Sequence, residues 1–599
     1  DKVRLSFGQP TRRAQSVAIA PDAMPSKTMG TPILGARDAP IPGITGNEVL
    51  RIDLGRYNIA DSVTADLSQT PQPPTLDSIA DAINAAIMTV PLLDANGDPV
   101  LDGSGNPRSR WQSRFAVEKT GEKWGLVLKT SGAEKLAIDQ VGAKDALMVV
   151  SGQTAIDAPG AAQILRFDDP AGSFGRKTLG SIAAIDREAT ERAKLVAPTA
   201  PASKDAPKPA VPMVPAATNA RAIATDIQGF SYVVGTTAGD LGANRSDGGN
   251  DLFLSKLDSE GKIVWQRTLG VAGEADGAAV SISANGDIVV AGTVKGPFNG
   301  APGTDSDMLV ARFDGAGDEK FATSVRGLGN DSASAVTVGV DGSIYVAGKS
   351  SSNGGDAFLA RLGADGKLAE RRTIDSGGND GITALAIDGT GALLALSKES
   401  GVARLRRIDA QAIASDLGTI TLGTADARAI AVSATGDIAV AGATYAALAG
   451  AQVNGASGGR DGFVTRIDAA LSGASTSYLG TSGDDQVDSV AFLGDAVYAG
   501  GRTTGALDGA QHGAVDGFVS RIDSATGAIE SISQFGQVAL RTEPVRIAAA
   551  QGGAGIMGAL GLRRGLVNSA DSTRLVAQTS VRAGDELAFA WKAGPSRRS

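Results

Sequence analysis

The sequence contains no cysteine and a single histidine, His512, among 599 residues. Without cysteine the chain forms no disulfide, and thiolate catalysis and cysteine-ligated zinc are excluded. One imidazole is too few for a multi-histidine metal site, and it makes a histidine-based catalytic triad hard to build. We therefore interpret His512, which lies in the Gly-rich stretch DGAQHGAV, as an exposed loop residue.

Aromatic residues make up only 4% of the chain, and no apolar run approaches the roughly 20 residues of a membrane-spanning helix. The net charge of −9 argues against binding to the phosphates of a nucleic acid. Glycine is abundant, with 79 residues that mostly separate short apolar runs. This texture is typical of a turn-rich, mainly β protein. Because the chain begins at Asp1 rather than Met, we expect that the native start precedes it.

One phrase recurs along the second half of the chain: Asp-x-Phe/Leu-x-x-Arg/Lys followed by a hydrophobic residue. Successive copies are separated by 56, 49, 46, 59, 55 and 55 residues, and the fourth copy, VARLRRIDA, is degraded. We interpret the phrase as a strand whose aspartate starts a turn and whose Phe packs between sheets. The repeat positions that we expect to be structural are Asp251, Phe253, Asp307, Asp356, Phe358, Asp461, Phe463, Arg466, Asp516, Phe518 and Arg521.

A second phrase lies between these copies: an apolar strand, a Gly-centred turn and an apolar strand that ends in Ala-Gly, as in AVSISANGDIVVAGT. Each unit therefore offers four short strands, and repeats of roughly 40–50 residues with four strands indicate a β-propeller. The hairpin phrase occurs seven times if the copy from Ala220 is included. We predict a seven-bladed propeller, closed by pairing of the hairpin at Ala220 with the C-terminal strands from Asp571, which leaves no open sheet edge.

The stretch DGFVTRIDA, followed by STSYLGTSGDDQVDSVAFLGDAVYAGGRT, resembles the bacterial SBBP-type β-propeller repeat. The resemblance extends from about Ala217 to Gly594 and departs from the family pattern at ALLALSK and VARLRRIDA. It implies an exported or surface protein with a scaffold or interaction role, because the family has no common catalytic residues.

A different module precedes the repeats. NEVLRIDLGRYN alternates like a strand, and TLDSIADAINAAI predicts a helix with Thr75 as its N-cap and an apolar stripe along one side. A polar loop, DANGDPVLDGSGNP, and two strands joined by a turn at Gly121 follow. The resulting small α+β domain is expected over 46–155, between an extended N-terminal arm (1–45) and a helix with a Pro/Ala-rich linker (156–218); the propeller is expected over 219–594.

LDSIADAINAAI and GLVLKTSGAEKLAI resemble, in this order, the flagellin-type insertion motif of flagellar hook-associated, cap and flagellin proteins. The residues that carry this resemblance are Ile79, Ile83, Asn84, Leu126, Leu128 and Ser131. It implies docking to a flagellar assembly. An unrelated helix-plus-hairpin domain is the alternative.

The Asp/Gly/Asn loops, such as SSNGGDAF and SGGRDGF, raise the question of calcium. None has EF-hand spacing or a nonapeptide repeat, so we predict aspartates that cap turns and no cofactor, with calcium as the alternative. Asp484 and Asp485 could form a glycosidase pair in principle, but they lie in a repeated turn, GTSGDDQVDS, and we interpret them as structural.

Together these observations predict a non-enzymatic, extracytoplasmic structural or interaction protein, associated with the bacterial flagellum and motility. Its expected partners are other protein subunits of a flagellar or surface assembly, in which it is present in multiple copies. Two alternatives remain: a propeller that binds a glycan or peptide, and a carbohydrate-active enzyme with two close carboxylates at the mouth of the channel.

Overall fold

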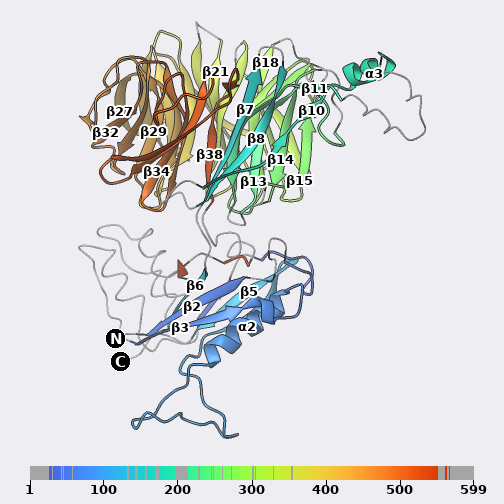
Figure 1. The fold of residues 1–599 in the computed structure, drawn as a ribbon, viewed down its shortest axis with the longest axis vertical. Coiled ribbons are helices and arrows are strands. Elements are labelled where there is room, and N and C mark those ends of the chain that lie inside the picture. Colours follow the sequence, from blue (N-terminus) through green and yellow to red (C-terminus); the bar gives the residue numbers. More distant parts are fainter. Residues whose placement is uncertain are drawn as a thin grey trace. The chain divides into compact units, whose positions relative to one another are not determined.

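The computed structural model describes residues 26–566 except for 30–31, 42–43, 45, 47, 57–58, 131–133, 142–145, 156–157, 169–174, 197–212, 227–228, 245, 247–248, 259–260, 272, 300–302, 304, 328, 352–354, 551–559 and 563–564. The chain forms two compact units (Figure 1). The small unit comprises Asp1–Lys144, Ile227–Gly229 and Gln551–Ser599, and the large unit comprises Asp145–Asp226 and Phe230–Ala550. Of the predicted N-terminal arm (1–45), the structure describes residues 26–29, 32–41 and 44.

The small unit consists of two sheets and a helix. The first sheet has the order β3-β2-β6-β39, formed by β2 (Val49–Arg56), β3 (Ile59–Asp66), β6 (Lys135–Gln140) and β39 (Gly565–Leu566). The second has the order β1-β5-β4, formed by β1 (Ser26–Met29), β4 (Arg114–Thr120) and β5 (Lys123–Thr130). A short 3₁₀ helix, η1 (Leu67–Gln69), follows β3.

Helix α2 (Leu76–Met88) confirms the predicted helix and its N-cap. The Thr75 hydroxyl accepts a hydrogen bond from the Ser78 amide at 3.3 Å, and the Ser78 hydroxyl accepts one from the Thr75 amide at 2.9 Å. This reciprocal pair is a capping box, which satisfies amides that lack partners inside the helix. The apolar stripe is fully buried: Leu76, Ile79, Ile83 and Ile87 are each 0% exposed.

The predicted polar loop between α2 and β4 is an arm of two successive turns. Isolated bridges join Leu93 to Pro99 and Leu101 to Pro107. In each turn one aspartate accepts two backbone amide hydrogen bonds; Asp94, for example, accepts them from Asn96 at 2.8 Å and Asp98 at 3.0 Å. The arm therefore has a defined backbone, which leaves Leu93 and Leu101 exposed at 41% and 56%.

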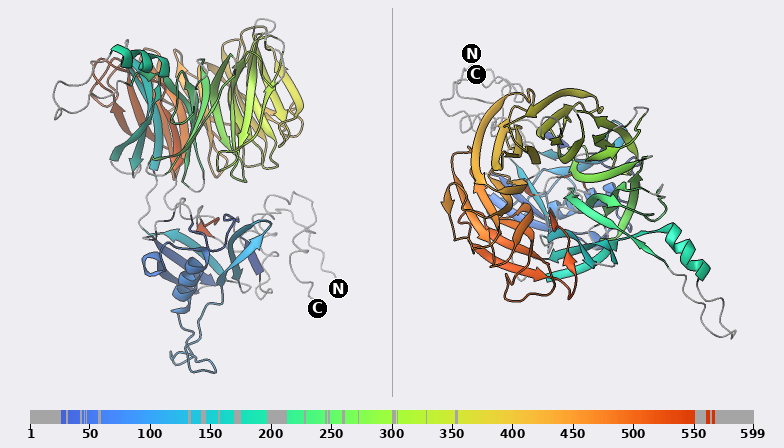
Figure 2. Two further views of the ribbon diagram at one scale, coloured as in Figure 1. Left: turned by 90° about the vertical axis from the view of Figure 1, so that its right-hand side faces the viewer. Right: turned by 90° about the horizontal axis from the view of Figure 1, so that it is seen from above.

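The large unit consists of antiparallel sheets that follow one another around a central opening in chain order (Figure 2). Sheets 1 to 3 are formed by β12 (Thr218–Thr225), β13 (Ser231–Thr237), β14 (Asp251–Leu257) and β15 (Ile263–Leu269); by β16 (Glu274–Ile282), β17 (Ile288–Lys295), β18 (Ser306–Phe313) and β19 (Glu319–Val325); and by β20 (Asp331–Val338), β21 (Ile344–Ser350), β22 (Asp356–Leu362) and β23 (Leu368–Ile374).

Sheets 4 to 6 continue the same order, each built as two hairpins. They are formed by β24 (Gly381–Ile387), β25 (Leu393–Glu399), β26 (Val402–Ile408) and β27 (Asp416–Thr424); by β28 (Asp426–Val432), β29 (Ile438–Thr444), β31 (Asp461–Ile467) and β32 (Ala474–Leu479), with β30 (Ala451–Gln452) added at the edge; and by β33 (Asp485–Leu493), β34 (Ala496–Thr503), β35 (Asp516–Asp523) and β36 (Ile529–Phe535).

Sheet 7 combines strands from the two ends of the large unit. It has the order β37-β7-β8-β9, formed by β7 (Ala146–Ala155), β8 (Ala158–Asp168), β9 (Gly175–Ile182) and β37 (Arg541–Thr542); β38 (Arg546–Ala550) also pairs with β7. In chain order between sheet 7 and sheet 1 lie helix α3 (Arg187–Val196) and the short pair β10 (Ala184–Ile185) and β11 (Pro215–Ala216). Neither helix described in the protein has the length and apolar character needed to cross a lipid bilayer.

Two predictions made from the sequence differ from the observed arrangement of strands. Residues 156–218 were expected to hold a helix and linker, but β8 and β9 lie in that range, because their apolar residues pack between sheets instead of forming a connection. The hairpin at Ala220 was expected to pair with strands from Asp571. Instead, β12 and β13 pair with β14 and β15, and residues from Asp571 onward lie outside the described residues.

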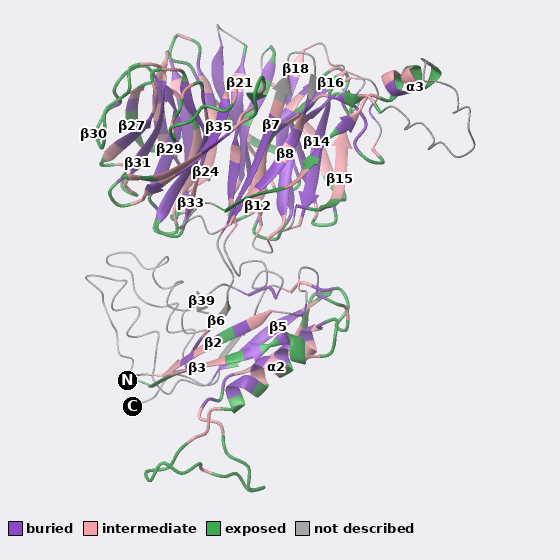
Figure 3. Ribbon diagram, in the orientation of Figure 1, coloured by how far each residue is buried: buried purple, intermediate pink, exposed green. Residues whose placement is uncertain are grey.

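The core of the large unit is a series of apolar layers between sheets rather than one central cluster (Figure 3). Strand β14, for example, is buried at all seven positions because both of its faces are covered by neighbouring sheets. Such layers also lie between sheets 6 and 7 and between sheets 7 and 1, where Phe253 and Val233 pack against Met148 and Val150.

Candidate functional site

The innermost strands of the seven sheets line a cavity of about 600 Å³. They are β12, β16, β20, β24, β28, β33 and β38, and each contributes at least two residues to its wall. A cavity of this size lies within the range of pockets that bind small molecules. We take this channel as the candidate functional site of the large unit.

A β-bulge occurs at the same place on six of the innermost strands. Pairing of the first and second strands of sheets 1 to 6 skips one residue, and the skipped residues are Arg221, Ala278, Ser334, Thr383, Arg428 and Asp488. Arg546 on β38 lies at the corresponding point of sheet 7, where the pairing with β7 is continuous. Bulges redirect side chains, and all seven of these residues line the cavity.

Asp488 is fully engaged within the wall of the channel and is 1% exposed. Its carboxylate forms a bidentate ion pair with Arg502 at 2.9 and 3.0 Å. It also accepts hydrogen bonds from Gln486 Nε2 at 2.5 Å and from the Val545 amide at 3.0 Å. Asp488 therefore ties β33 to the segment that leads into β38, and its charge is compensated locally.

Asp426 pairs with two arginines, Arg428 and Arg460. Its Oδ2 accepts hydrogen bonds from Arg428 Nε and Arg460 Nη2, both at 3.0 Å. Arg460 also donates from Nη1 to Gln486 at 2.8 Å. One carboxylate thus serves two guanidiniums, and this side of the channel carries more positive than negative charge.

Arg221 and Arg546 are the arginines with the fewest compensating partners. Arg221 is exposed to the channel and forms no hydrogen bond or ion pair with any residue that the structure describes. Arg546 donates from Nη1 to the Asp488 carbonyl at 2.5 Å, while its Nε has no partner there. Burial lowers the pKa of Arg546; the charge of Asp488 opposes this, and the charges of Arg502, Arg221 and Arg428 lower it further.

The repeated aspartates do not line the channel; they lie at the entry of the third strand of sheets 1, 2, 3, 5 and 6. Asp461 accepts a hydrogen bond from the Ser457 amide at 3.0 Å, and Asp516 accepts one from the His512 amide at 2.6 Å. Both aspartates are buried, and the His512 side chain is exposed. Asp251, Asp307 and Asp356 are also buried at the corresponding strand entries. Asp461 and Asp516 therefore act in turns, whereas Asp307 forms an ion pair with Arg326 at 2.8 Å. The described residues contain no group of three potential metal-ligating side chains.

The repeated aromatic residues lie in the apolar layers. Phe253, Phe463 and Phe518 are each 0% exposed, and Phe358 is 3% exposed. Asp485, considered as one of a glycosidase pair, is 0% exposed and accepts hydrogen bonds from the amide and hydroxyl of Thr481 at 2.5 and 2.9 Å. Its neighbour Asp484 uses its backbone amide to donate to Thr504 Oγ1 at 2.7 Å, which fixes the same turn.

The Arg or Lys that recurs in the Asp-x-Phe/Leu-x-x-Arg/Lys phrase connects neighbouring sheets. This role was not predicted from the sequence. Arg466 on β31 donates to the carbonyls of Ser524 and Ala525, in the outer turn of sheet 6, at 2.8 and 2.6 Å. Equivalent bonds to the turn of the following sheet are donated by Lys256 to Gly315, by Arg312 to Ala364 and by Arg407 to Ala469. Arg521 instead bonds Tyr498 and Asp495 within its own sheet.

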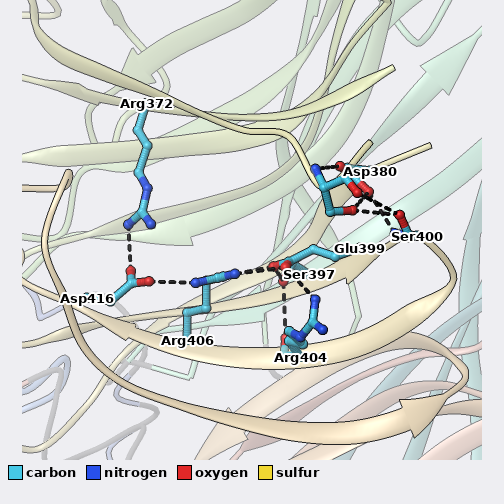
Figure 4. Close-up of polar contacts among 9 residues, drawn as sticks. Arg372, Asp380, Ser397, Glu399, Ser400, Arg404, Arg406 and Asp416 are labelled. Atoms are coloured by element: carbon cyan, nitrogen blue, oxygen red, sulfur yellow. Dashed lines mark hydrogen bonds and ion pairs between the residues drawn. The ribbon is translucent and has the colours of Figure 1, made fainter. Parts of the chain in front are cut away.

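Sheet 4, where the repeat pattern is degraded, carries a compensating charge network (Figure 4). Val402 replaces the usual aspartate, and the acidic group stands on the facing strand as Glu399, which pairs with Val402 in register. Glu399 is 2% exposed and accepts hydrogen bonds from Arg406 Nε and Nη2 and from Arg404 Nη1, all at 2.8 Å. Arg406 and Arg372 both bind Asp416, at 2.5 and 2.6 Å, so the network joins sheets 3 and 4.

These contacts hold Glu399 ionised. Burial alone would raise the pKa of Glu399, but hydrogen bonds from Arg406, Ser397 and Arg404 outweigh it and lower the pKa to about 2. A carboxylate that stays deprotonated at all moderate pH values does not serve as a general acid. Glu399 and Asp416 are joined through Arg406, which binds both carboxylates.

In the small unit, the residues of the predicted motif are brought together around α2. Ile79, Ile83, Leu126 and Leu128 belong to one apolar cluster. Asn84 donates from Nδ2 to the Phe115 carbonyl and accepts from the Phe115 amide, both at 2.8 Å, so it fixes α2 to strand β4. Ser131 lies outside the described residues.

Comparison with known proteins supports both resemblances predicted from the sequence. Residues 26–136 match the family model of the FlaEY third domain, and residues 214–242 match the SBBP β-propeller repeat. The chain is also similar to the regulatory protein FlaEY of Caulobacter vibrioides. The two are 25% identical over 670 residues, which cover 98% of this chain and 67% of the relative.

Similar solved structures include a putative 6-phosphogluconolactonase from Bacteroides fragilis, at 13% identity and a TM-score of 0.39, with 68% of this chain and 99% of that chain covered. They also include the Pan2 WD40 domain from Neurospora crassa, at 11% identity and a TM-score of 0.31, with 55% and 79% covered. Neither similarity bears on function.

Proposed function

We propose that the protein is a non-enzymatic, flagellum-associated interaction protein. The small unit docks to a flagellar or other surface assembly, and the large unit presents a rigid platform to further protein subunits. One observation carries this proposal: similarity to the regulatory protein FlaEY extends over 98% of the chain and includes the match of residues 26–136 to the FlaEY third domain.

The rigidity of the platform follows from a complete ring of seven blades, closed by sheet 7. Three observations support this closure. Strand β38 pairs with β7, although more than 390 residues separate them in the chain, as the register Arg546 to Val150 illustrates. An apolar layer also lies between sheets 7 and 1. Finally, Ser489 on β33 donates to the Val545 carbonyl at 2.8 Å, next to β38.

The absence of catalysis is part of the proposal. Its support is that two buried carboxylates, those of Asp488 and Glu399, are compensated by arginine. A hydrolytic site needs a carboxylate that faces its substrate and titrates near the working pH. An activity screen with glycosides and lactones as substrates should therefore detect no turnover, and saturable turnover abolished by substitution of a channel residue would contradict this part.

The proposed location is extracytoplasmic, in the periplasm or on the flagellum, with several copies in one assembly. The resemblance of the repeats to SBBP-type propellers, which are mostly exported, supports it. Fractionation of cells that express the full-length protein should recover it outside the cytoplasm. Recovery in the cytoplasmic fraction alone would contradict this location.

Docking through the small unit is tested on its exposed apolar side chains. Met88, Leu93 and Leu101, at the end of α2 and on the two-turn arm, are 57%, 41% and 56% exposed. Replacing all three by serine should reduce association with isolated flagella at least tenfold, because apolar contacts dominate the core of protein interfaces. The fold should be unaffected because these side chains are exposed.

A matched control replaces three exposed apolar residues of the large unit, Val340, Leu417 and Val538, by serine. This variant should retain association with the flagellar fraction. If the large-unit variant loses association and the small-unit variant keeps it, the docking roles of the two units are the reverse of those proposed.

A further inference from the structure

The wall of the channel is asymmetric in charge. In ring order, the residues at the bulge position are Arg221, Ala278, Ser334, Thr383, Arg428, Asp488 and Arg546. The three arginines therefore stand on one arc, formed by β28, β33, β38 and β12, whose neighbouring members contact each other. The opposite arc, on β16, β20 and β24, presents a methyl group and two hydroxyl groups.

The wall carries three arginines and three aspartates, but two of these aspartates also pair with arginines that do not line the cavity, Arg460 and Arg502. Five guanidiniums, those of Arg221, Arg428, Arg460, Arg502 and Arg546, are gathered there around two carboxylates. Asp488 and Asp426 are used by Arg502 and by the Arg428–Arg460 pair. The third carboxylate that lines the cavity, Asp276, stands on β16 and accepts from Thr236 at 3.1 Å. Even with Asp276 counted, the cluster keeps two positive charges.

Arg221 has donors available to a ligand, and Arg546 has an unsatisfied donor, Nε, that is itself buried. Arg221 is exposed to the cavity without a partner among the described residues, and Arg546 Nε has no acceptor there. The two guanidiniums lie close enough to repel each other, since the charge of Arg221 contributes to the lowered pKa of Arg546. Unpaired cations held together in a partly enclosed cavity repel one another, and an anion between them relieves that repulsion.

We propose that the channel is a binding site for a small oxyanion ligand, a polycarboxylate or a phosphate, held by Arg221 and Arg546 with Arg428 beside them. Guanidinium groups bind such oxyanions through paired, charge-assisted hydrogen bonds. The Ser334 hydroxyl of the opposite arc provides a neutral donor for the rest of the ligand, and the Thr383 oxygen lines the same arc as an acceptor. Thr383 is oriented by a bond from its own hydroxyl to the Ala427 carbonyl at 2.9 Å. The cavity of about 600 Å³ accommodates a molecule of this size.

The test is calorimetric titration of the purified full-length protein with citrate and, separately, with inorganic phosphate at constant ionic strength set by sodium chloride. The expected result is saturable binding of one anion per chain for at least one of the two probes. Competition between the probes identifies which oxyanion the site prefers. Because purified protein is used, the result is independent of any association with flagella.

Arg221→Gln is the decisive variant, because Arg221 supports no other described contact and its replacement should leave the melting temperature unchanged. It should weaken binding at least tenfold. Arg546→Gln should weaken binding as well; since Arg546 also bonds the Asp488 carbonyl, its melting temperature is measured alongside. The matched control is Arg192→Gln on helix α3, whose partner is Glu188 on the helix surface, and it should bind as the unmodified protein does.

Absence of saturable binding by both probes would overturn the proposal. Binding that Arg221→Gln leaves unchanged would overturn it equally, because the anion would then occupy another site.

Discussion

Gly480 lies directly against the carboxylate of Asp461, so that a Cβ atom at position 480 would overlap Asp461 Oδ1. Asp461 opens β31 and Gly480 follows the last residue of β32, so the contact crosses two paired strands of sheet 5. The other oxygen of the carboxylate accepts the Ser457 amide at 3.0 Å. Gly536 and Asp516 repeat the arrangement in sheet 6. The recurring aspartate is thus bonded to a turn on one side and covered by a glycine on the other.

Gly480→Ala should therefore lower the free energy of unfolding by about 1–3 kcal/mol, the usual cost of an atom forced into packed space. The backbone of Gly480 is not in the left-handed region, so the cost is steric. Denaturant unfolding measures it. Gly455→Ala is the control, because a Cβ there meets nothing within 4 Å. In an Asp461→Ala background the effect of Gly480→Ala should shrink, and an unchanged effect would refute the contact.

Phe463→Ala should destabilise the large unit by about 3–5 kcal/mol, as expected for a large aromatic side chain removed from a packed interior. Phe463 is 0% exposed in the layer between sheets 4 and 5. The melting temperature and the denaturant midpoint should both fall. Val340→Ala, at a position 86% exposed, should leave both unchanged. A variant that melts normally but loses a binding activity would show that Phe463 belongs to a site.

Glu399→Gln should destabilise the protein by about 3 kcal/mol at pH 7, because it leaves Arg404 and Arg406 without their buried counter-charge. The pKa of Glu399 in the folded protein, about 2, lies below its ordinary value of 4.5. The stabilisation by the ionised group is therefore fully present above pH 4.5 and is lost as the pH falls toward 2.

The stability difference between Glu399→Gln and the unmodified protein should consequently narrow between pH 4.5 and pH 2, as measured by denaturant unfolding at each pH. Glu319→Gln, at an exposed strand position, serves as the control and should show little difference at any pH. A difference that is constant with pH would mean that Glu399 is not held ionised by its arginines.

Closure of the ring through sheet 7 is testable by a disulfide, since the chain has no cysteine of its own. Met148 and Ala548 face each other in the register of β7 and β38, and both are buried. The double variant Met148→Cys/Ala548→Cys should form an intramolecular disulfide upon mild oxidation, detected as a mass loss of two hydrogens and a shift on a non-reducing gel. Failure of the pair to cross-link while the protein remains folded would argue that another strand occupies this place.

The repeat made most of the large unit predictable from sequence, because each copy of DGFVTRIDA or its hairpin partner carries its own strand periodicity and turn residues. The α2 helix was predictable for the same reason: its N-cap at Thr75 and its apolar stripe are local signals. Strands β8 and β9 were not, since they lack the repeat phrase; their sheet partners are neighbours in sequence, and only β7 pairs with distant strands, β37 and β38.

The candidate site in the channel was not predicted from the sequence, for a related reason. Arg221, Arg428 and Arg546 stand about 120–200 residues apart in the chain, and each looks like an isolated charge in an apolar strand. Only the contacts between β28, β33, β38 and β12 in the folded protein bring them to one arc. A signal was present nonetheless: when the hairpin phrases are aligned on their glycine turns, one position of the first strand varies between Arg, Ala, Ser, Thr and Asp while its neighbours stay small and apolar. That variable position is the bulge.

The central claim is the association with a flagellar assembly, and the most direct measurement is quantitative mass spectrometry of hook–basal bodies and filaments purified from cells that carry the unmodified full-length protein. The account predicts enrichment of the protein relative to an abundant periplasmic marker, and loss of this enrichment in the Met88, Leu93 and Leu101 serine variant. Equal recovery of the protein and the marker in every fraction would contradict it.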